Sequence, residues 1–544
     1  MPHVVTQSCC ADASCVVACP VNCIHPAPGE PGFGTTEMLF IDPATCVGCS
    51  ACVTACPVGA IVPDSALTAE QLPFLELNAD YYRETPHAER TPLALVPEQR
   101  RLRRPGPFRV AVVGAGPAGL YTADELLTHP EITNVDVYER LLTPHGLVRH
   151  GVAPDHPDTK GVTAAFRDIE DQPGFRYVLG RDVGTDITLA ELTSAYHAVV
   201  YAVGASTDRP LNIPGEDSRG SLAATDIVGW YNGHPERADL EVPLDHERAV
   251  VVGNGNVALD VARILTRDPH WLAANTDTAS TALTALADSA VREVHILGRR
   301  GPSDAAFTIP ELIGLSNLRD VDVIVDADPA LLSGDDRRSR LLADIASRRP
   351  SDTASRRRIV LRFATSPVAV LTEGGRVSGV QVVRNELEIG TDGTVRAAPT
   401  SDTDVIPAGL VVRSVGFRGQ PVADLPFDAV TGTVPNVRGR VDDGVFVVGW
   451  IKRGARGFIG TNKSDARETV ESVLDHLDDS VHRVTTTPSS GRSGDLAGWR
   501  RLDARELADG RAAGRPRAKI VSYTDQLAAH RARETKGRGL FRRA

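Results

Sequence analysis

The 544-residue chain has few aromatic residues, no Lys or Arg before Arg83 and no long hydrophobic run. Phe, Trp and Tyr together make up 5% of the sequence, and the formal net charge is −11. A nucleic-acid partner is therefore not expected, because binding it needs basic and stacking side chains. No apolar segment is long enough to span a bilayer, and the first residues lack the basic and hydrophobic regions of a signal peptide. We expect a soluble, cytoplasmic monomer with no membrane partner.

Cysteine is missing from everything after Cys56, so all nine cysteines lie between Cys9 and Cys56. A disulfide scaffold would not crowd its cysteines into one end of a long cytoplasmic chain, and metal or redox use is the better interpretation. The rest of the chain has no CxxC pair, which argues against a disulfide reductase.

Two cysteine runs repeat one spacing. The second run, CVGCSACVTACP at residues 46–57, has the C-x2-C-x2-C-x3-C-P pattern of bacterial two-cluster ferredoxins, in which the fourth cysteine binds the other cluster. The first run starts at Cys9 and repeats this spacing with Asp12 in place of the second cysteine. Exchanging the fourth cysteines gives one complete set of four thiolates, expected to hold [4Fe–4S]: Cys19, Cys46, Cys49 and Cys52. A zinc site is the alternative, but zinc takes four ligands and would leave the second set redundant.

The other set has only three thiolates, those of Cys9, Cys15 and Cys56. Three thiolates suit [3Fe–4S]. Asp12 could instead give an oxygen ligand to a fourth iron, which would make a second [4Fe–4S] cluster, or it could be an exposed turn residue. Cys10 and Cys23 remain, and we expect them to be buried or to lie beside the clusters.

Residues 109–139 predict a first dinucleotide site. An apolar run at 109–113 is typical of a buried parallel strand, and a glycine-rich turn then leads into a helix that begins near Ala118. The glycines of the turn, Gly114, Gly116 and Gly119, let a pyrophosphate approach the helix N-terminus. A second strand-like run ends at Glu139, where an acid accepts hydrogen bonds from a ribose. The alternative is a structural turn with no ligand.

A second dinucleotide site is predicted at residues 249–265, AVVVGNGNVALDVARIL, where strand, glycine turn and helix follow one another again. Its turn residues are the candidate ligands: Gly253, Asn254, Gly255, Asn256 and Val257. The next strand ends in Arg299 and Arg300, where an NAD site would have an acid. Two guanidinium groups match a 2′-phosphate through planar, bidentate hydrogen bonds, so NADP is favoured over NAD. Two solvated arginines at a strand end are the alternative.

Two parts of the chain resemble known families. The segments VVTQSCCADASCVVACPVNCIH and CVGCSACVTACPVGAI resemble a seven-iron bacterial ferredoxin. The turn GAGPAGLY and the segment GLVRHGVAPDHPDTKGV at 146–162 resemble adrenodoxin reductase, the FAD-containing ferredoxin–NADP reductase. This second likeness continues to about Val470.

The reductase resemblance implies roles for individual residues. Contacts with FAD are implied for the glycine turn and for eight further residues: Ala118, Glu139, Leu147, Val183, Trp450, Gly457, Phe458 and Ile459. His156 is implied near the isoalloxazine, where it would modulate electron transfer. The FTIPE segment implies Glu311 near the nicotinamide, and Gly457 is implied there too. His156 and Glu311 are therefore the candidate catalytic residues.

We predict an α/β architecture with two Rossmann-like domains and a small α+β ferredoxin domain. The predicted divisions are a ferredoxin module at 1–62, a connector at 63–106, an FAD domain at 107–206 and 408–544 that includes the C-terminal tail, and an inserted NADP domain at 207–407. The connector segment LPFLELNADYY is expected to pack on the module. The segment GLVVRSVGF at 409–417 is expected to be the strand that returns to the FAD domain.

The predicted activity is that of a ferredoxin–NADP(+) reductase. NADPH gives a hydride to FAD, which can hold two electrons and release them singly to the fused clusters. The final acceptor is expected to be a separate ferredoxin-type carrier or a cytochrome, and the direction is reversible in principle. Alternatively, the fused module is itself the final carrier. One alternative is a small-subunit-type NADPH reductase that feeds a partner enzyme, as in glutamate synthase. Another is a redox sensor or adaptor without turnover.

Overall fold

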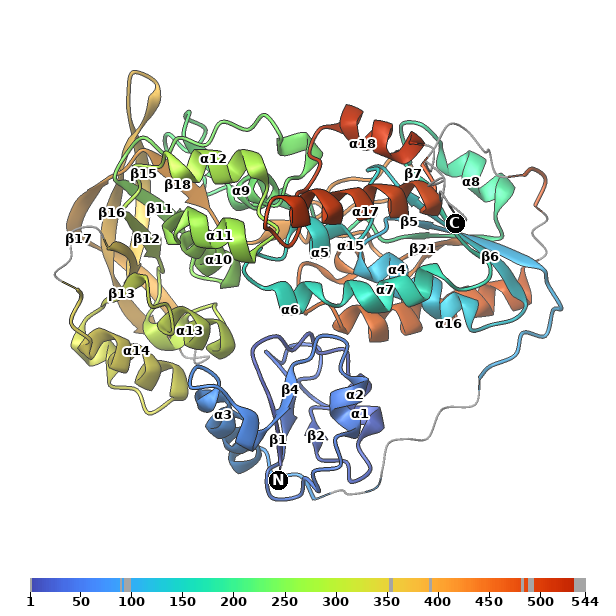
Figure 1. Ribbon diagram of the computed structural model, residues 1–544, viewed down its shortest axis with the longest axis horizontal. Helices are drawn as coiled ribbons and strands as arrows, with labels where there is room; N and C mark the ends of the chain where they lie inside the picture. The colour runs from blue at the N-terminus through green and yellow to red at the C-terminus, as the bar shows by residue number, and fades with distance from the viewer. Residues whose placement is uncertain are drawn as a thin grey trace, which may run out of the picture.

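The computed structural model describes residues 2–88, 91, 99–351, 356–390, 394–480, 484–487 and 494–532. Two six-stranded sheets with helices around them form two lobes, and a small N-terminal module lies beside both (Figure 1). The α/β fold predicted from the sequence is confirmed. None of the helices in the described ranges is long and apolar enough to cross a membrane. The Arg-rich end of the tail, after residue 532, lies outside the described residues.

The N-terminal module consists of two short strand pairs and two short helices. Its strands pair antiparallel, β1 (His3–Val5) with β4 (Ile61–Pro63) and β2 (Ile24–His25) with β3 (Phe40–Ile41). Its helices are α1 (Ser14–Ala18) and α2 (Ala51–Ala55). Each helix follows a residue in the left-handed region, Ala13 with φ 61° and Ser50 with φ 63°. The two cysteine runs therefore fold alike, although Asp12 replaces a cysteine in the first.

The connector helix α3 (Leu72–Glu84) packs on the module, as predicted. The Asn78 side-chain oxygen accepts hydrogen bonds from the backbone N–H groups of Val5, at 3.2 Å, and Ile41, at 2.9 Å. The Tyr82 hydroxyl donates to the carbonyl oxygens of Cys23 and Phe40. These buried bonds tie α3 to strands β1 and β3, so the helix is part of the module.

The first lobe is built on a mostly parallel sheet with β5 at its centre. The strands in spatial order are β20 (Arg440–Asp442), β21 (Val445–Val447), β8 (Ala198–Tyr201), β5 (Phe108–Val113), β6 (Ile132–Glu139) and β7 (Phe175–Leu179). Alternate residues of β5 face different cores: Val110 and Val112 face one, Ala111 and Val113 the other. Helix α4 (Pro117–Leu127) follows β5 and packs against α16 (Thr461–Asp479) and α7 (Thr163–Glu170). Burial on both faces explains why β5 is continuously apolar.

The second lobe is built on an entirely parallel sheet. Its strands in spatial order are β10 (Ser221–Ala223), β18 (Leu410–Arg413), β11 (Arg248–Val252), β12 (Glu293–Leu297), β14 (Arg357–Arg362) and β13 (Val321–Asp326). Its main helices are α9 (Ala224–Tyr231), α10 (Asn256–Thr266), α11 (Pro269–Asn275), α12 (Ser280–Ala287), α13 (Ile309–Ser316) and α14 (Arg337–Ser347). An antiparallel three-stranded sheet, β15 (Thr365–Glu373), β16 (Arg376–Ile389) and β17 (Val395–Pro407), adjoins it.

The placement of one predicted strand is wrong. The segment 409–417 was expected to return the chain to the first lobe, but β18 pairs in parallel with β10 and β11 of the second sheet. The chain crosses between the lobes just before and just after the second sheet. The two crossings pair with each other as β9 (Thr207–Asp208) and β19 (Phe417–Arg418). An apolar strand fits either sheet equally well, so composition alone could not place β18.

The C-terminal tail joins the two lobes. Helices α17 (Leu496–Ala512) and α18 (Tyr523–Arg531) lie against the first lobe, where the buried Glu506 carboxylate accepts a hydrogen bond of 2.6 Å from Arg149. Between these helices, Lys519 forms an ion pair of 2.8 Å with Asp277 of the second lobe. The tail therefore fixes the lobes relative to each other.

Candidate redox sites

The first glycine turn lies between β5 and α4. A Cβ at Gly119 would overlap the carbonyl oxygen of Gly114, so only glycine lets α4 begin this close to the strand. A Cβ at Gly146 would meet the Cα of Gly116 at 2.9 Å, which places Leu147 directly beside the turn. Such a backbone cradle at a helix N-terminus fits the pyrophosphate of FAD.

Glu139 ends β6 next to this turn. Its carboxylate accepts hydrogen bonds from the backbone N–H groups of Ala115, at 3.0 Å, and Leu141, at 3.1 Å. Burial raises the pKa of Glu139, although these N–H groups oppose the shift. The acid is thereby held at the strand end, in the place that ribose recognition requires.

The C-terminal segment that resembles a flavin-binding segment returns to the same turn. A Cβ at Gly449 would meet the Cβ of Ala118 at 2.6 Å, so the residues before helix α15 (Trp450–Arg453) rest on the start of α4. Phe458 and Ile459 pack against the core that α4 shares. Val183 lies in a separate core cluster, on the other face of the first sheet. Its segment still lies next to Glu139, whose carbonyl oxygen accepts the Arg181 N–H at 3.0 Å. The structure thus brings most of the predicted FAD residues to one end of the first sheet.

His156 and Glu311 come from different lobes and meet between them. His156 precedes α6 (Pro157–Lys160), Glu311 lies in the first turn of α13, and His156 Nε2 is 3.7 Å from Glu311 Oε2. Arg263 of α10 joins them, since it donates to Glu311 at 3.2 Å and to His156 Nε2. The two predicted catalytic side chains therefore share one cluster.

Three members of this cluster were missed from the sequence: Asp155, Asp260 and Arg263. The buried Arg263 guanidinium donates to Asp155 at 2.9 Å and to Asp260 at 2.7 Å. Burial raises the pKa of Asp260 to about 6, against the pull of Arg263. One signal was available, because Asp260 and Arg263 stand three residues apart on the helix after the second glycine turn and so share a face.

A cavity of about 1040 Å³ opens between the lobes at the second glycine turn. All the predicted NADP turn residues line it, and so do Arg299 and Arg300. Seven of its lining residues are Lys or Arg and one, Asp304, is acidic. The sequence analysis missed five of these basic residues: Arg209, Arg418, Lys452, Arg453 and Arg456. A cavity with this charge fits a dinucleotide that carries an extra phosphate.

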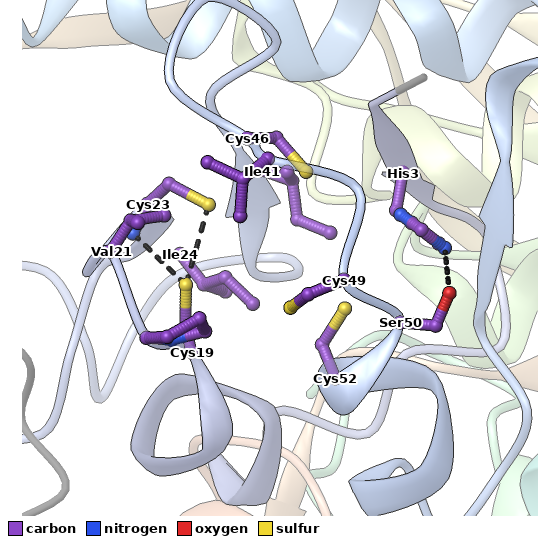
Figure 2. Close-up of a pocket in the computed structure, with 12 residues that line it drawn as sticks. His3, Cys19, Val21, Cys23, Ile24, Ile41, Cys46, Cys49, Ser50 and Cys52 are labelled. Atoms are coloured by element: carbon purple, nitrogen blue, oxygen red, sulfur yellow. Dashed lines mark hydrogen bonds between the residues drawn. The ribbon is translucent and has the colours of Figure 1, made fainter.

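The four-thiolate set lines a small cavity in the module (Figure 2). Figure 2 shows the sulfurs of Cys19, Cys46, Cys49 and Cys52 around this cavity. The buried Cys23 lies beside them, with its sulfur 3.4 Å from that of Cys19. Hydrogen bonding from Cys23 lowers the pKa of Cys46 to about 4 and that of Cys19 to about 6. Four convergent thiolates fit a [4Fe–4S] cluster, and the expectation that Cys23 lies beside it is met.

The three-thiolate set gathers around Asp12. Burial raises the pKa of Cys9 to about 11, and the nearby Cys56 and Asp12 add to the shift. Burial also raises the pKa of Cys15, followed by the charges of Cys9 and Asp12. One Asp12 carboxylate oxygen accepts a 3.3 Å bond from the Ser14 N–H, and the other accepts from the Ser14 hydroxyl. The donor set fits an iron–sulfur cluster with three sulfur ligands.

Comparison with known proteins decides the family. A Mycobacterium tuberculosis protein named "Probable ferredoxin/ferredoxin–NADP reductase" is 47% identical over 97% of this chain and 95% of its own length. The chain belongs to the ferredoxin/ferredoxin–NADP reductase family. The profile described as "4Fe-4S binding domain" matches residues 39–62, and the one described as "Pyridine nucleotide-disulphide oxidoreductase" matches residues 108–300.

Two further relatives match about three quarters of this chain. The human protein named "NADPH:adrenodoxin oxidoreductase, mitochondrial" is 40% identical over 77% of this chain and 91% of its own length. The solved structure of M. tuberculosis FprA in complex with NADPH superposes with a TM-score of 0.74 at 42% identity, covering 78% of this chain and all of FprA. The predicted family, fold and oxidoreductase class are confirmed.

Proposed function

We propose that this ferredoxin–NADP reductase passes electrons from NADPH to a ferredoxin or a similar one-electron acceptor, such as a cytochrome. The path runs through FAD and the clusters of its own module. The observation that carries the proposal is one continuous hydrophobic core, which joins Cys19 and Cys52 of the module to Val112 and Leu120 of the first lobe. Because every predicted centre lies in one packed chain, we also propose that a cytoplasmic monomer is the working unit.

When bound, FAD supplies the exchange between the paired electrons of NADPH and the single electrons of iron–sulfur clusters. The residues of the chain supply placement. The glycine turn after β5, Glu139 and the segment 457–459 would hold FAD, whereas the cavity between the lobes would hold NADPH. Arg263 fixes Glu311 and His156 at the junction of the lobes, which supports a role for both at the nicotinamide and flavin rings.

The division of the chain follows from the strand pairing. We propose a module at 1–62 with its connector helix α3, a first lobe for FAD, and an NADP lobe that includes β18 and therefore extends to Arg413. The end of the NADP domain therefore moves from residue 407, as predicted from the sequence, to Arg413.

We propose that the two cysteine sets hold different clusters. Four thiolates favour [4Fe–4S] at Cys19, Cys46, Cys49 and Cys52. At Cys9, Cys15 and Cys56, we favour [3Fe–4S], because both Asp12 oxygens already accept hydrogen bonds from Ser14. Iron analysis and an EPR spectrum of anaerobically purified protein test this, with about seven irons per chain expected. Zinc, or about eight irons, contradicts the assignment.

The choice of NADPH is tested by truncating the two arginines at the end of β12. A charge-assisted hydrogen bond contributes about 1.5–3 kcal/mol, so Arg299→Ala or Arg300→Ala should lower the preference for NADPH over NADH roughly ten- to hundredfold. The measurement is kcat/KM for both nucleotides with a dye acceptor. Arg219→Ala is a matched control, since Arg219 is exposed and pairs with Glu241 elsewhere on the second lobe. An unchanged preference would remove the proposed phosphate site.

A further inference from the structure

The two cysteine sets of the module have different surroundings. We call Cys9, Cys15 and Cys56 the inner site, and Cys19, Cys46, Cys49 and Cys52 the outer site. Within the described part of the chain, every residue that lines the outer-site cavity belongs to the module, from His3 to Cys52. Cys49 is exposed, and Val47, which directly follows Cys46, has 61% of its surface accessible. The outer site therefore faces solvent.

The inner site faces the reductase lobes. In the described residues, the loop that carries Cys9 and the start of α1 contact these lobes through three hydrogen bonds. The Gly460 N–H donates to the Cys10 carbonyl oxygen at 2.8 Å, and Lys463 Nζ donates to the Ser14 hydroxyl at 3.3 Å. Gln7 donates to Glu311 at 3.5 Å, which links the same loop to the cluster between the lobes.

Backbone meets backbone at Gly460. A Cβ there would overlap the backbone of Asp12, so only glycine lets these two segments of the chain come this near. Gly460 directly follows the segment 457–459 that we assign to FAD. We call this contact between the module and the reductase lobes the seam. Tyr121, on the helix after the first glycine turn, also lies there: burial raises its pKa, and the charges of Cys10 and Asp12 add to the shift. No side chain of residue 460 therefore stands between the flavin-binding segment and the inner-site loop.

We infer that the two sites act in series, with the inner site receiving each electron first from the FAD lobe and the outer site passing it out near Cys49. This order rests on the proposed function. NADPH loses a hydride, which is two electrons and a proton, and becomes NADP+. Each cluster takes one electron and the proton passes to water, so one NADPH fills both clusters. Electrons thus enter the module at the site with three thiolates and leave it at the site with four.

Matched double variants test the order. Cys9→Ala with Cys15→Ala removes the inner cluster, and Cys46→Ala with Cys49→Ala removes the outer one, which the loss of iron verifies. Each protein is mixed anaerobically with one equivalent of NADPH, and the remaining cluster is followed by freeze-quench EPR. Without the outer cluster, the inner one should be reduced at the wild-type rate. Without the inner cluster, the outer one should be reduced more than about tenfold more slowly, although dithionite still reduces it.

A charge reversal at the seam tests the same order without touching a cysteine. Lys463→Glu puts a carboxylate next to Ser14 and Asp12, so NADPH should reduce both clusters more slowly. Arg505→Glu is the control, because Arg505 pairs with Asp509 on α17, away from the module. This variant also decides the question if an inner-site variant fails to fold.

The outcomes separate the order from the function. If the outer cluster is reduced at an unchanged rate without the inner one, the series order is wrong even though NADPH still bleaches the flavin. If NADPH bleaches no flavin in the wild-type protein, the proposed function itself is wrong.

Discussion

The inner and outer sites are two copies of one local structure in two settings. Helix α1 follows Ala13 at φ 61° and is followed by Cys19, and helix α2 follows Ser50 at φ 63° and is followed by Cys56. The φ and ψ angles at these two cysteines agree within a few degrees, −75° and 117° against −78° and 116°. The backbone of the cysteine run is therefore insensitive to the exchange of a cysteine for Asp12.

What differs is the contacts made by each copy. The outer site has an extra buried thiol, Cys23, and an exposed ligand, Cys49. The inner site has Asp12 in place of a ligand, and Gly460 of the reductase lies against it. The spacing of the cysteines determines where a cluster can form. The contacts of each site determine whether it can receive electrons directly from the FAD lobe or can pass them to a partner in solution. Four changes test this contrast.

The largest effect is expected from Gly460→Leu. The new side chain would collide with the backbone of Asp12 and lift the inner loop from the reductase. Reduction of both clusters by NADPH should slow by about a hundredfold or more, while dithionite still reduces them. Stopped-flow absorption and freeze-quench EPR measure this. Gly34→Leu is the matched control, because nothing lies within 4 Å of a Cβ at this exposed module residue. Wild-type rates in Gly460→Leu would show that the contact carries no electrons.

The second change removes the difference in ligand number. Asp12→Cys restores the missing cysteine of the first run, in a backbone that already matches the second. We expect the inner site to take a fourth iron, so that iron rises from about seven to about eight per chain and the EPR signal of a [3Fe–4S] cluster disappears. Asp12→Asn serves as the control and should leave the iron content unchanged. A retained three-iron signal in Asp12→Cys would mean that the loop cannot bring a thiolate to the cluster.

A smaller effect is expected from the thiol beside the outer site. A hydrogen bond to a cluster sulfur favours the reduced, more negative state. Removing this bond with Cys23→Ala should make reduction of the outer cluster less favourable by about 1 kcal/mol. Its reduction potential should therefore fall by on the order of 40 mV for one electron, while that of the inner cluster stays unchanged. Redox titration followed by EPR resolves the two clusters. Cys10→Ala is the matched control, a buried cysteine that lies beside the inner site instead. An equal shift at both sites would contradict the local cause.

The sequence predicted those parts of the molecule that are local in the chain. Each of these patterns, the pair of cysteine runs or a glycine turn with the acid or arginine that ends the next strand, spans no more than about 50 residues. Their spacing is set by covalent geometry and by strand and helix lengths, so it can be read directly. The family, the fold, and the turn residues and two strand-end arginines that line the second dinucleotide cavity could be predicted for this reason.

The parts that could not be predicted depend on packing between distant segments. Arg263 joins Asp155 and Glu311 from three separate elements, and the seam pairs Cys10 with Gly460 across most of the chain. Nothing in the local pattern of a helix indicates which charged residue will be buried between two lobes. The prediction of which sheet β18 joins failed for a related reason, because any parallel strand buried on both faces has the same apolar composition.

The smallest effect is expected from Glu37, a module residue that contacts α13 and α14 of the second lobe. Its carboxylate accepts the Ile309 N–H at 2.8 Å and pairs with Arg338 at 3.3 Å, yet burial raises its pKa above 4.5. The folded protein therefore holds a proton that the unfolded chain has lost, and this contribution to stability disappears as pH rises from 4.5 through the raised pKa. Glu37→Gln keeps an acceptor for Ile309 and should change the free energy of unfolding at pH 7 by less than about 1 kcal/mol.

Glu37→Ala is the contrasting variant, because it leaves the Ile309 N–H without its acceptor. We expect it to cost about 1–3 kcal/mol in urea denaturation. Glu37→Gln should also flatten the dependence of stability on pH between pH 4.5 and 7, while the EPR spectrum of the outer site stays the same in both variants. If Glu37→Gln destabilises the protein as much as Glu37→Ala, the ion pair with Arg338 stabilises the protein by more than burial of the Glu37 charge costs. The seam would then be held by charge and should weaken with salt, whereas a seam held by close packing at Gly460 should not.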